Sequence, residues 1–135
     1  NQVSLLDDIP SALPALSRAQ KLQKRAARVG FDWHHREDVV AKLDEEVGEL
    51  KEALVHADQA EIEAEFGDIL LAMVNLGRHL RVDAESALRQ ANRRFESRFK
   101  LMEQSAQADG SSLEQESLQK LEIRWQEAKQ TLSSS

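Results

Sequence analysis

The chain has no cysteine and no long apolar run. Without cysteine there can be neither a disulfide framework nor a thiolate site, and this composition is compatible with the cytoplasm, where we expect the protein to lie. No stretch approaches the roughly 20 apolar residues that a membrane-spanning helix needs. We therefore expect no membrane partner.

Helix breakers are also scarce, with 5 glycines and 2 prolines in 135 residues. Apolar residues recur with the three-and-four spacing of helices and few β-branched runs occur, so the sequence predicts an all-α protein. Short connections favour antiparallel neighbours, and hence an antiparallel bundle of about four main helices plus an additional helix. The expected helices cover about 11–29, 38–56, 59–80, 83–106 and 112–132.

A chain of this length is expected to form one domain. We place that domain at 11–132, after a linker-like segment at 1–10 and before a disordered tail at 133–135. Because the chain begins at Asn1 rather than at a methionine, we also expect it to be a domain of a longer protein.

Single residues mark several of the expected helix boundaries. Ser11 is the expected N-cap of the first helix, and Gly30 is its expected stop. Asp83 can cap the fourth helix. A break at Gly110 should end that helix before Ser112 opens the last one.

Positive charge is in short supply: 18 Lys and Arg stand against 24 Asp and Glu, and the net charge is -6. An acidic chain of this kind disfavours nonspecific binding to nucleic acid, and we expect no such partner. A small anionic substrate would need a local basic patch or a metal ion.

The acidic residues include two clusters with helical spacing, Glu45-Glu46-x-x-Glu49 and Glu65-x-x-Asp68. Residues three or four apart share one face of a helix, so the carboxylates of each cluster project together. In an antiparallel hairpin that turns near residue 57, Glu46 lies level with Asp68 and Glu49 lies level with Glu65. The two clusters are therefore predicted to form one ring of four carboxylates.

The hairpin itself is indicated by Asp58, which can cap a new helix, and by Glu61 three residues later, which completes a capping box. Carboxylates packed in such a ring repel one another unless a cation is bound. Oxygen ligands without cysteine, and without histidine at ligand spacing, favour Mg2+ or Mn2+ over Zn2+. The alternative is that these are solvated helix faces in an acidic chain.

Apolar stripes on the two central helices predict which faces are buried. We expect both stripes to face a helical core. They comprise Val40, Leu43, Val47, Leu50 and Leu54 on the first helix, and Ile62, Phe66, Ile69, Met73, Leu76 and Leu80 on the second.

Five basic or aromatic residues are candidates for binding a substrate. Lys42, one turn before the first cluster, could reach a phosphate, or it could only form a surface ion pair. Arg94 and Arg98, four residues apart, could form a fork for phosphate oxygens, although exposed arginines are common. Trp125 and Lys129 would present an aromatic surface beside a cation, unless Trp125 is simply part of the core.

Four further residues each have two interpretations. Gly48 and Gly67 interrupt good helix sequence at a cost of about 1 kcal/mol each compared with alanine. They could allow a close approach of the carboxylates or pack against a third helix, and a helical wheel favours packing because it places both glycines away from the carboxylate faces. Trp33 is expected to staple the first loop to the bundle. Asn75 lies on the face of Asp68 and could hydrogen-bond a substrate, although helix packing is the more common role.

Taken together, these residues resemble the MazG-type nucleoside triphosphate pyrophosphohydrolases of the all-α NTP pyrophosphatase superfamily, and most of all the C-terminal domain of two-domain bacterial members. The acidic clusters carry the resemblance. It is supported by Leu13-Pro14-Ala15-Leu16, Arg18-Ala19-Gln20-Lys21, Gly30-Phe31-Asp32-Trp33, Ala91-Asn92-Arg93-Arg94-Phe95 and Trp125-Gln126-Glu127-Ala128-Lys129.

The resemblance implies a role for each acidic residue. Glu46, Glu49, Glu65 and Asp68 would be the Mg2+ ligands, with Mn2+ as a possible substitute. Glu45 would be a catalytic carboxylate that helps to orient or deprotonate water.

It also implies that Lys42, Arg94, Arg98, Trp125 and Lys129 contact the nucleotide. Arg94 stands where relatives often have lysine, which keeps the charge but changes the geometry of the fork.

The implied reaction is hydrolysis of an NTP or dNTP between its α and β phosphates, by a homodimer with sites near the subunit interface. The alternative is a noncatalytic helical module for dimerisation or regulation. A di-iron carboxylate bundle would need Glu-x-x-His pairs, and the sequence has none.

Overall fold

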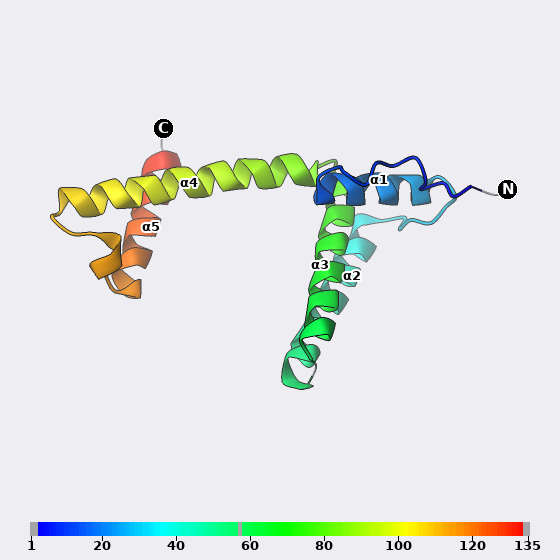
Figure 1. Cartoon of the computed structure of the whole chain (residues 1–135), viewed down its shortest axis with the longest axis horizontal. Coiled ribbons are helices and arrows are strands. Elements are labelled where there is room, and N and C mark those ends of the chain that lie inside the picture. Colours follow the sequence, from blue (N-terminus) through cyan, green and yellow to red (C-terminus); the bar gives the residue numbers. More distant parts are fainter. Residues whose placement is uncertain (1–2, 57, 134–135) are drawn as a thin grey trace. The chain divides into compact units, whose positions relative to one another are not determined.

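The structure is a computed structural model that describes residues 3–56 and 58–133. Within these ranges the secondary structure is helical, with no strand, which confirms the predicted all-α class (Figure 1). The elements are α1 (Ala15–Ala27), α2 (Arg36–His56), α3 (Gln59–His79), α4 (Ala84–Ala108), the short 3-10 helix η1 (Leu113–Gln115) and α5 (Leu118–Ser133).

The chain divides into two compact units, and the boundary falls between Ala87 and Leu88, in the first part of α4. In the first unit α2 packs along α3, and α1 also packs on α3. Val39 of α2 and Val74 of α3 are almost completely buried there, with exposed fractions of 1% and 2%. The predicted turn of the hairpin at residue 57 lies outside the described residues.

The predicted apolar stripes are confirmed in part. Their central members Leu43, Val47 and Leu50 on α2, and Ile62, Ile69 and Leu76 on α3, are half-buried. On α2 the buried positions are Val39, Glu46 and Ala53, whereas Val40 and Leu54 are exposed. The seam between α2 and α3 therefore runs about one position earlier along α2 than the stripe of large apolar residues indicates. This shift leaves Val40 and Leu54 on the surface and carries the carboxylate of Glu46 inside.

The segment before α1 packs on that helix. Ile9 is buried. The guanidinium of Arg25 donates to the carboxylate of Asp8, and it also donates to the backbone carbonyl of Leu5 at 2.8 Å. Ser11 is not the N-cap: Pro14 occupies that position, and its fixed backbone angle suits the start of a helix.

Glycine ends α1 as predicted. Gly30 adopts a left-handed backbone conformation with φ of 89°, which a residue without a Cβ enters at no steric cost. The backbone N–H of Phe31 then donates to the carbonyl of Ala26 at 3.2 Å, closing a Schellman motif. The loop that follows is thereby turned back along the first unit.

The predicted caps of α3 and α4 are confirmed. The carboxylate of Asp58 accepts from the backbone N–H of Glu61 at 3.0 Å, and that of Asp83 accepts from the N–H of Glu85 at 3.1 Å. Each aspartate satisfies a backbone donor that the first turn of a helix leaves open.

In the second unit, α4 and α5 are joined by a buried arginine. The guanidinium of Arg124 binds both carboxylate oxygens of Glu116, at 2.6 and 2.7 Å, and donates to the hydroxyl of Ser105 at 2.8 Å. Met102 and Ala128 are buried in the same unit.

The predicted break at Gly110 is confirmed, with φ of 73° at that residue. Ser112, however, does not open the last helix; it precedes η1 and its side chain caps nothing. The hydroxyl of Ser117 accepts from the N–H of Lys120 at 3.2 Å instead, so α5 begins later than expected. Of the predicted tail, Ser133 ends α5 and residues 134–135 lie outside the described part.

In the described part of the chain, every helix is too short or too polar to cross a lipid bilayer.

Candidate metal centre and adjoining cavity

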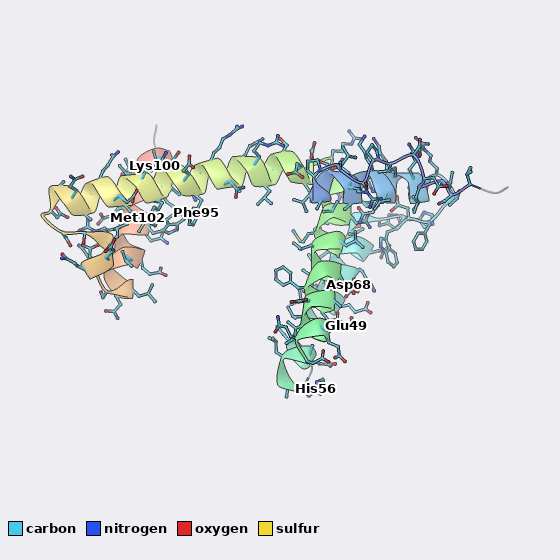
Figure 2. All side chains as sticks on the ribbon, in the orientation of Figure 1. Glu49, His56, Asp68, Phe95, Lys100 and Met102 are labelled. Carbon is cyan, nitrogen blue, oxygen red and sulfur yellow. The ribbon has the colours of Figure 1, made fainter. Side chains whose placement is uncertain are left out.

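Three of the four predicted metal ligands come together between α2 and α3. Glu46, Glu49 and Glu65 each offer a carboxylate oxygen, and these three oxygens lie within 4.8 Å of one another. Asp68 is exposed and is not part of this group, although it lies one helical turn beyond Glu65. Figure 2 shows Glu49 and Asp68 on the α2–α3 hairpin.

The charge of the group is only partly compensated, by Lys42 on one oxygen of Glu46. Glu46 is 7% exposed. One oxygen of Glu46 and one of Glu65, each the Oε2 atom, are buried without a hydrogen-bond partner in the described structure. The neighbouring carboxylate of Glu46, burial and the carboxylate of Glu65 raise the pKa of Glu49 above its ordinary value. Hard oxygen donors with unmet charge are what a divalent cation of the Mg2+ type requires, so the residues present fit such an ion.

Lys42 forms an ion pair with Glu46, one of the two roles predicted for it. Its ammonium lies 3.0 Å from Oε1 of Glu46 and 3.8 Å from Oε1 of Glu45, whose side chain is 60% exposed. The hydrogen bond to Glu46 and the charge of Glu45 raise the pKa of Lys42. Lys42 is thus held as a cation at the edge of the carboxylate group.

A cavity of about 500 Å³ adjoins the carboxylate group in the first unit. Lys42, Glu46 and Asp68 lie in its wall, so it opens onto the predicted metal ligands. The rest of the wall comes from α1, from the loop after it and from one face of α3: Gln23, Ala26, Gly30, Phe31, Asp32, Trp33, Leu71, Ala72, Asn75 and Arg78.

Asp32 ties the loop of this cavity to α3. Its Oδ1 accepts from a guanidinium nitrogen of Arg78 at 2.5 Å and lies 2.9 Å from Nε2 of His79. Burial works to raise the pKa of Asp32, but the hydrogen bonds from Arg78 and His79 outweigh it and the pKa is lowered. The carboxylate is therefore held ionised between two basic side chains.

Sequence reasoning missed this cluster. No histidine has ligand spacing in the sequence, and Asp32 and Arg78 are 46 residues apart, so no local spacing relates the members of the cluster. Trp33, predicted to staple the first loop to the bundle, is 45% exposed and lines the cavity instead.

Gly48 and Gly67 do not mark close packing in the chain as described. A Cβ added at either would meet no atom within 4 Å, so neither the approach of the carboxylates nor a third helix explains them. The structure offers no other reason for the two glycines.

The remaining predicted site residues belong to the second unit. Arg94 and Arg98 line one hollow of about 360 Å³ near the end of α5. The guanidinium of Arg98 also lies 5.5 Å from the ring centre of Trp125, a cation–π distance, and Phe95 contacts the same ring at 5.3 Å (Figure 2 labels Phe95). Lys129 is exposed on α5.

Comparison with known proteins identifies the family. Residues 34–102 match the MazG nucleotide pyrophosphohydrolase domain, and the chain belongs to this family. The matched stretch contains the carboxylate group together with Lys42, Arg94 and Arg98, and the resemblance recognised in the sequence is confirmed.

Two similar relatives are nucleoside triphosphate pyrophosphohydrolases by name. The chain is 48% identical over 93% of its length to "Nucleoside triphosphate pyrophosphohydrolase/pyrophosphatase MazG" of Thermotoga maritima, and covers 48% of that protein. It is 49% identical over 95% of its length to "Nucleoside triphosphate pyrophosphohydrolase" of Escherichia coli strain K12, and covers 49% of it. The chain thus spans about half the length of these curated relatives.

A third relative, "Uncharacterized protein YabN" of Bacillus subtilis, is 43% identical over 97% of the chain, which covers 27% of that protein.

Proposed function

We propose that this chain is a Mg2+-dependent nucleoside triphosphate pyrophosphohydrolase, which converts an NTP or dNTP to the nucleoside monophosphate and pyrophosphate. The observation that carries the proposal is the group of Glu46, Glu49 and Glu65 in a chain of the MazG family, with two buried carboxylate oxygens that have no partner among the described residues. The names of the relatives from Thermotoga maritima and Escherichia coli support the same reaction.

The proposed cofactor is Mg2+, with Mn2+ as a substitute, because the donors are carboxylate oxygens. Glu46, Glu49 and Glu65 would hold it, and Asp68 would complete the set from the next turn of α3. When bound, Mg2+ would neutralise the negative charge of the triphosphate and the charge that develops during bond cleavage.

The side chains of the protein then have distinct roles. In the proposed reaction a water molecule attacks the α-phosphorus. The bond from this phosphorus to the oxygen that bridges to the β-phosphorus breaks, and pyrophosphate leaves. Glu45, exposed next to the group, is proposed to accept the proton of the water. Lys42, which keeps its positive charge beside Glu46, is proposed to bind a phosphate oxygen.

Arg94, Arg98, Trp125 and Lys129 are proposed as further nucleotide contacts. The two arginines share one hollow, and the stacked pair of Arg98 and Trp125 offers a cation beside an aromatic ring. A guanidinium pair of this kind suits phosphate oxygens.

A homodimer is proposed because α3 presents an uncovered apolar stripe. Phe66, Leu70 and Met73, spaced four and three residues apart, are each about half exposed, at 54%, 45% and 47%. A contiguous exposed apolar face of a helix is typical of a surface that binds a partner. Sedimentation velocity should give a dimer for the wild type and a monomer for Leu70→Glu, whereas Glu63→Gln on the same helix should stay dimeric. A monomeric wild type would contradict the dimer.

The decisive experiment incubates the purified chain with each NTP and dNTP plus Mg2+, and separates monophosphate and pyrophosphate from diphosphate and phosphate. We expect monophosphate and pyrophosphate, lost in Glu49→Gln and kept in Glu52→Gln, which removes an exposed carboxylate on the same helix. Turnover that does not need Mg2+, or that survives in Glu49→Gln, would reject the mechanism.

The second candidate function is a noncatalytic helical interaction module. It is favoured only by the exposed apolar stripe of α3. A module of this kind should show no turnover and no rise of the melting temperature with Mg2+, because only a real site links metal binding to stability. The cytoplasmic location and the absence of a nucleic-acid partner stay predictions.

A further inference from the structure

Lys42 borders both the carboxylate group and the open space beside it. Its ammonium is 3.0 Å from Oε1 of Glu46 and 3.8 Å from Oε1 of Glu45, whose side chain is 60% exposed. Lys42 and Glu46 are also both part of the cavity wall. The ammonium therefore lies at the boundary between the predicted metal ligands and the space that a phosphate could enter.

The two partners of this ion pair differ in how deeply they are buried. The side chain of Glu46 is 9% exposed, whereas that of Lys42 is 39% exposed. Lysine carries its charge on a flexible four-carbon stem, so the ammonium can move while the buried carboxylate stays in place. Lys42 is thus the partner that can leave the pair.

The attraction that holds Lys42 comes from the carboxylate group as a whole. Glu46, Glu49 and Glu65 offer oxygens within 4.8 Å of one another, and the ammonium offsets part of their negative charge. A divalent cation bound among these carboxylates would cancel two of the three negative charges that they carry when ionised, and it would also repel the ammonium. Both effects weaken the attraction of Glu46 for Lys42.

This weakening must act in both directions, because the coupling between two binding events is reciprocal. If a bound metal ion weakens the ion pair of Lys42 and Glu46, the ion pair weakens the binding of the metal ion by the same factor. Lys42 and a metal ion therefore compete for the charge of Glu46.

We propose that Lys42 exchanges partners: it pairs with Glu46 until a divalent cation binds to the carboxylate group, and its ammonium then turns to a phosphate oxygen of the substrate. This inference rests on the proposed function and adds an order of binding to it. Without a metal ion, a polyphosphate is repelled by the carboxylates and finds Lys42 already paired. Metal binding removes both obstacles.

A fixed positioning role is the alternative for Lys42. In that role the ammonium would stay on Oε1 of Glu46 and hold this carboxylate ready for the metal ion, so removing the ammonium would weaken metal binding. The exchange of partners predicts the opposite, because removing a competing cation strengthens metal binding. The sign of the effect therefore separates the two roles.

The test is a calorimetric titration of the intact chain with Mg2+ in the absence of nucleotide. We expect Lys42→Met to bind Mg2+ about tenfold more tightly than the wild type. Lys42→Arg keeps the charge and should bind Mg2+ as the wild type does. Lys51→Met removes an exposed lysine from the same helix and makes the same change in net charge, so it should change the affinity by less than about twofold.

A second measurement follows Lys42 in the wild-type chain and does not depend on the folding of Lys42→Met. It records the NMR signal of the Cε methylene of Lys42 in 13C-labelled protein, assigned with Lys42→Arg. Mg2+ should shift and sharpen this signal as the ammonium leaves Glu46. Inorganic tripolyphosphate, added with Mg2+ in excess, should then shift and broaden it, whereas tripolyphosphate without Mg2+ should leave it in place.

Three results would overturn the exchange: weaker or unchanged Mg2+ binding by a folded Lys42→Met protein, a Lys42 signal that Mg2+ leaves in place, or a shift of this signal by tripolyphosphate without Mg2+. Any of them in a chain that binds Mg2+ and hydrolyses NTPs would leave the proposed function intact. A wild type that binds no Mg2+ would reject the proposed function and the exchange with it. Tighter Mg2+ binding by Lys42→Met in a chain without turnover would support the exchange at Glu46 and reject the activity.

Discussion

Lys42 and Glu46 form an ion pair in which only one oxygen of the carboxylate is used. The ammonium lies 3.0 Å from Oε1 of Glu46, while Oε2 is buried without a partner in the described chain. The pair is positioned by the i,i+4 spacing on α2, and both residues border the cavity. Lys42 therefore fixes a carboxylate that belongs to the predicted metal site and also lines the cavity.

Replacing Lys42 with methionine should damage both stability and activity. The buried carboxylate of Glu46 would lose the cation that compensates it, so we expect a lower melting temperature without Mg2+. Loss of a phosphate-binding cation should reduce kcat/KM by about 100-fold. Thermal melts and NTP hydrolysis measure the two effects, with Lys42→Arg as the variant that keeps the charge. Normal activity in Lys42→Met would remove Lys42 from the site.

The metal-free protein should become more stable when the pH falls from neutral. The carboxylates of Glu46 and Glu65 and burial raise the pKa of Glu49, so the folded state binds a proton at this site more tightly than the unfolded state. Stability must then rise as the pH falls through the raised pKa toward the ordinary value of 4.5. Glu49→Gln should weaken this dependence of stability on pH. Without Mg2+ at neutral pH, its melting temperature should be higher than that of the wild type.

Chemical denaturation in the presence of a chelator, at several pH values, tests this prediction. Saturating Mg2+ should stabilise the wild type at neutral pH and leave Glu49→Gln little changed. A wild type whose stability falls steadily from pH 7 downward, in parallel with Glu49→Gln, would contradict the prediction.

Arg81 offers a site for stabilisation. It has φ of 60°, and the backbone N–H of Val82 next to it donates to the carbonyl of Gly77 at 2.7 Å. This is the left-handed position that ends a helix, and it disfavours residues with a Cβ. Arg81→Gly should raise the free energy of unfolding by up to about 1 kcal/mol, measured by urea denaturation.

Gly77→Ala should act in the opposite direction in the same assay. A Cβ at Gly77 would lie 3.1 Å from the carbonyl oxygen of Val82, which this turn holds close. Equal stability of Gly77→Ala and wild type would show that the turn can relax.

The buried pair of Arg124 and Glu116 should make the second unit sensitive to acid. The hydrogen bond from Arg124 lowers the pKa of Glu116, so the ionised carboxylate is favoured by folding. Its contribution is complete above the ordinary value of 4.5 and is lost as the pH falls through the lowered pKa. Glu116→Gln should lower the melting temperature at pH 7 and make the stability depend less on pH below 4.5.

Glu114→Gln, which changes an exposed carboxylate two residues earlier, is the control and should melt like the wild type. Arg124→Met combined with Glu116→Gln should recover part of the melting temperature that Glu116→Gln loses, because the double change leaves no unpaired buried charge. A single variant as stable as the wild type would mean that the pair contributes little.

Much of the local structure could be predicted because its causes are local. Asp58 caps α3 and Gly30 ends α1, and each acts on backbone groups within a few residues of itself. Glu46, Glu49 and Glu65 come together because of helical spacing and because residues equally far from the turn of an antiparallel hairpin lie level with each other. The predicted cap at Ser11 was wrong because Pro14 takes that position, and the one at Ser112 was wrong because Ser117 caps the last helix instead.

The amino-acid sequence by itself determined the all-α class, most of the helix ends and three of the four carboxylates predicted to meet, because helix periodicity and capping depend on neighbouring residues. The tertiary structure alone decided that Val39 rather than Val40 is buried, and that Asp32 meets Arg78 and His79 beside Gln23. These contacts depend on how α1 and its loop pack on α3. They join residues with no periodic relation in the chain, so only the packing of the first unit could bring them together.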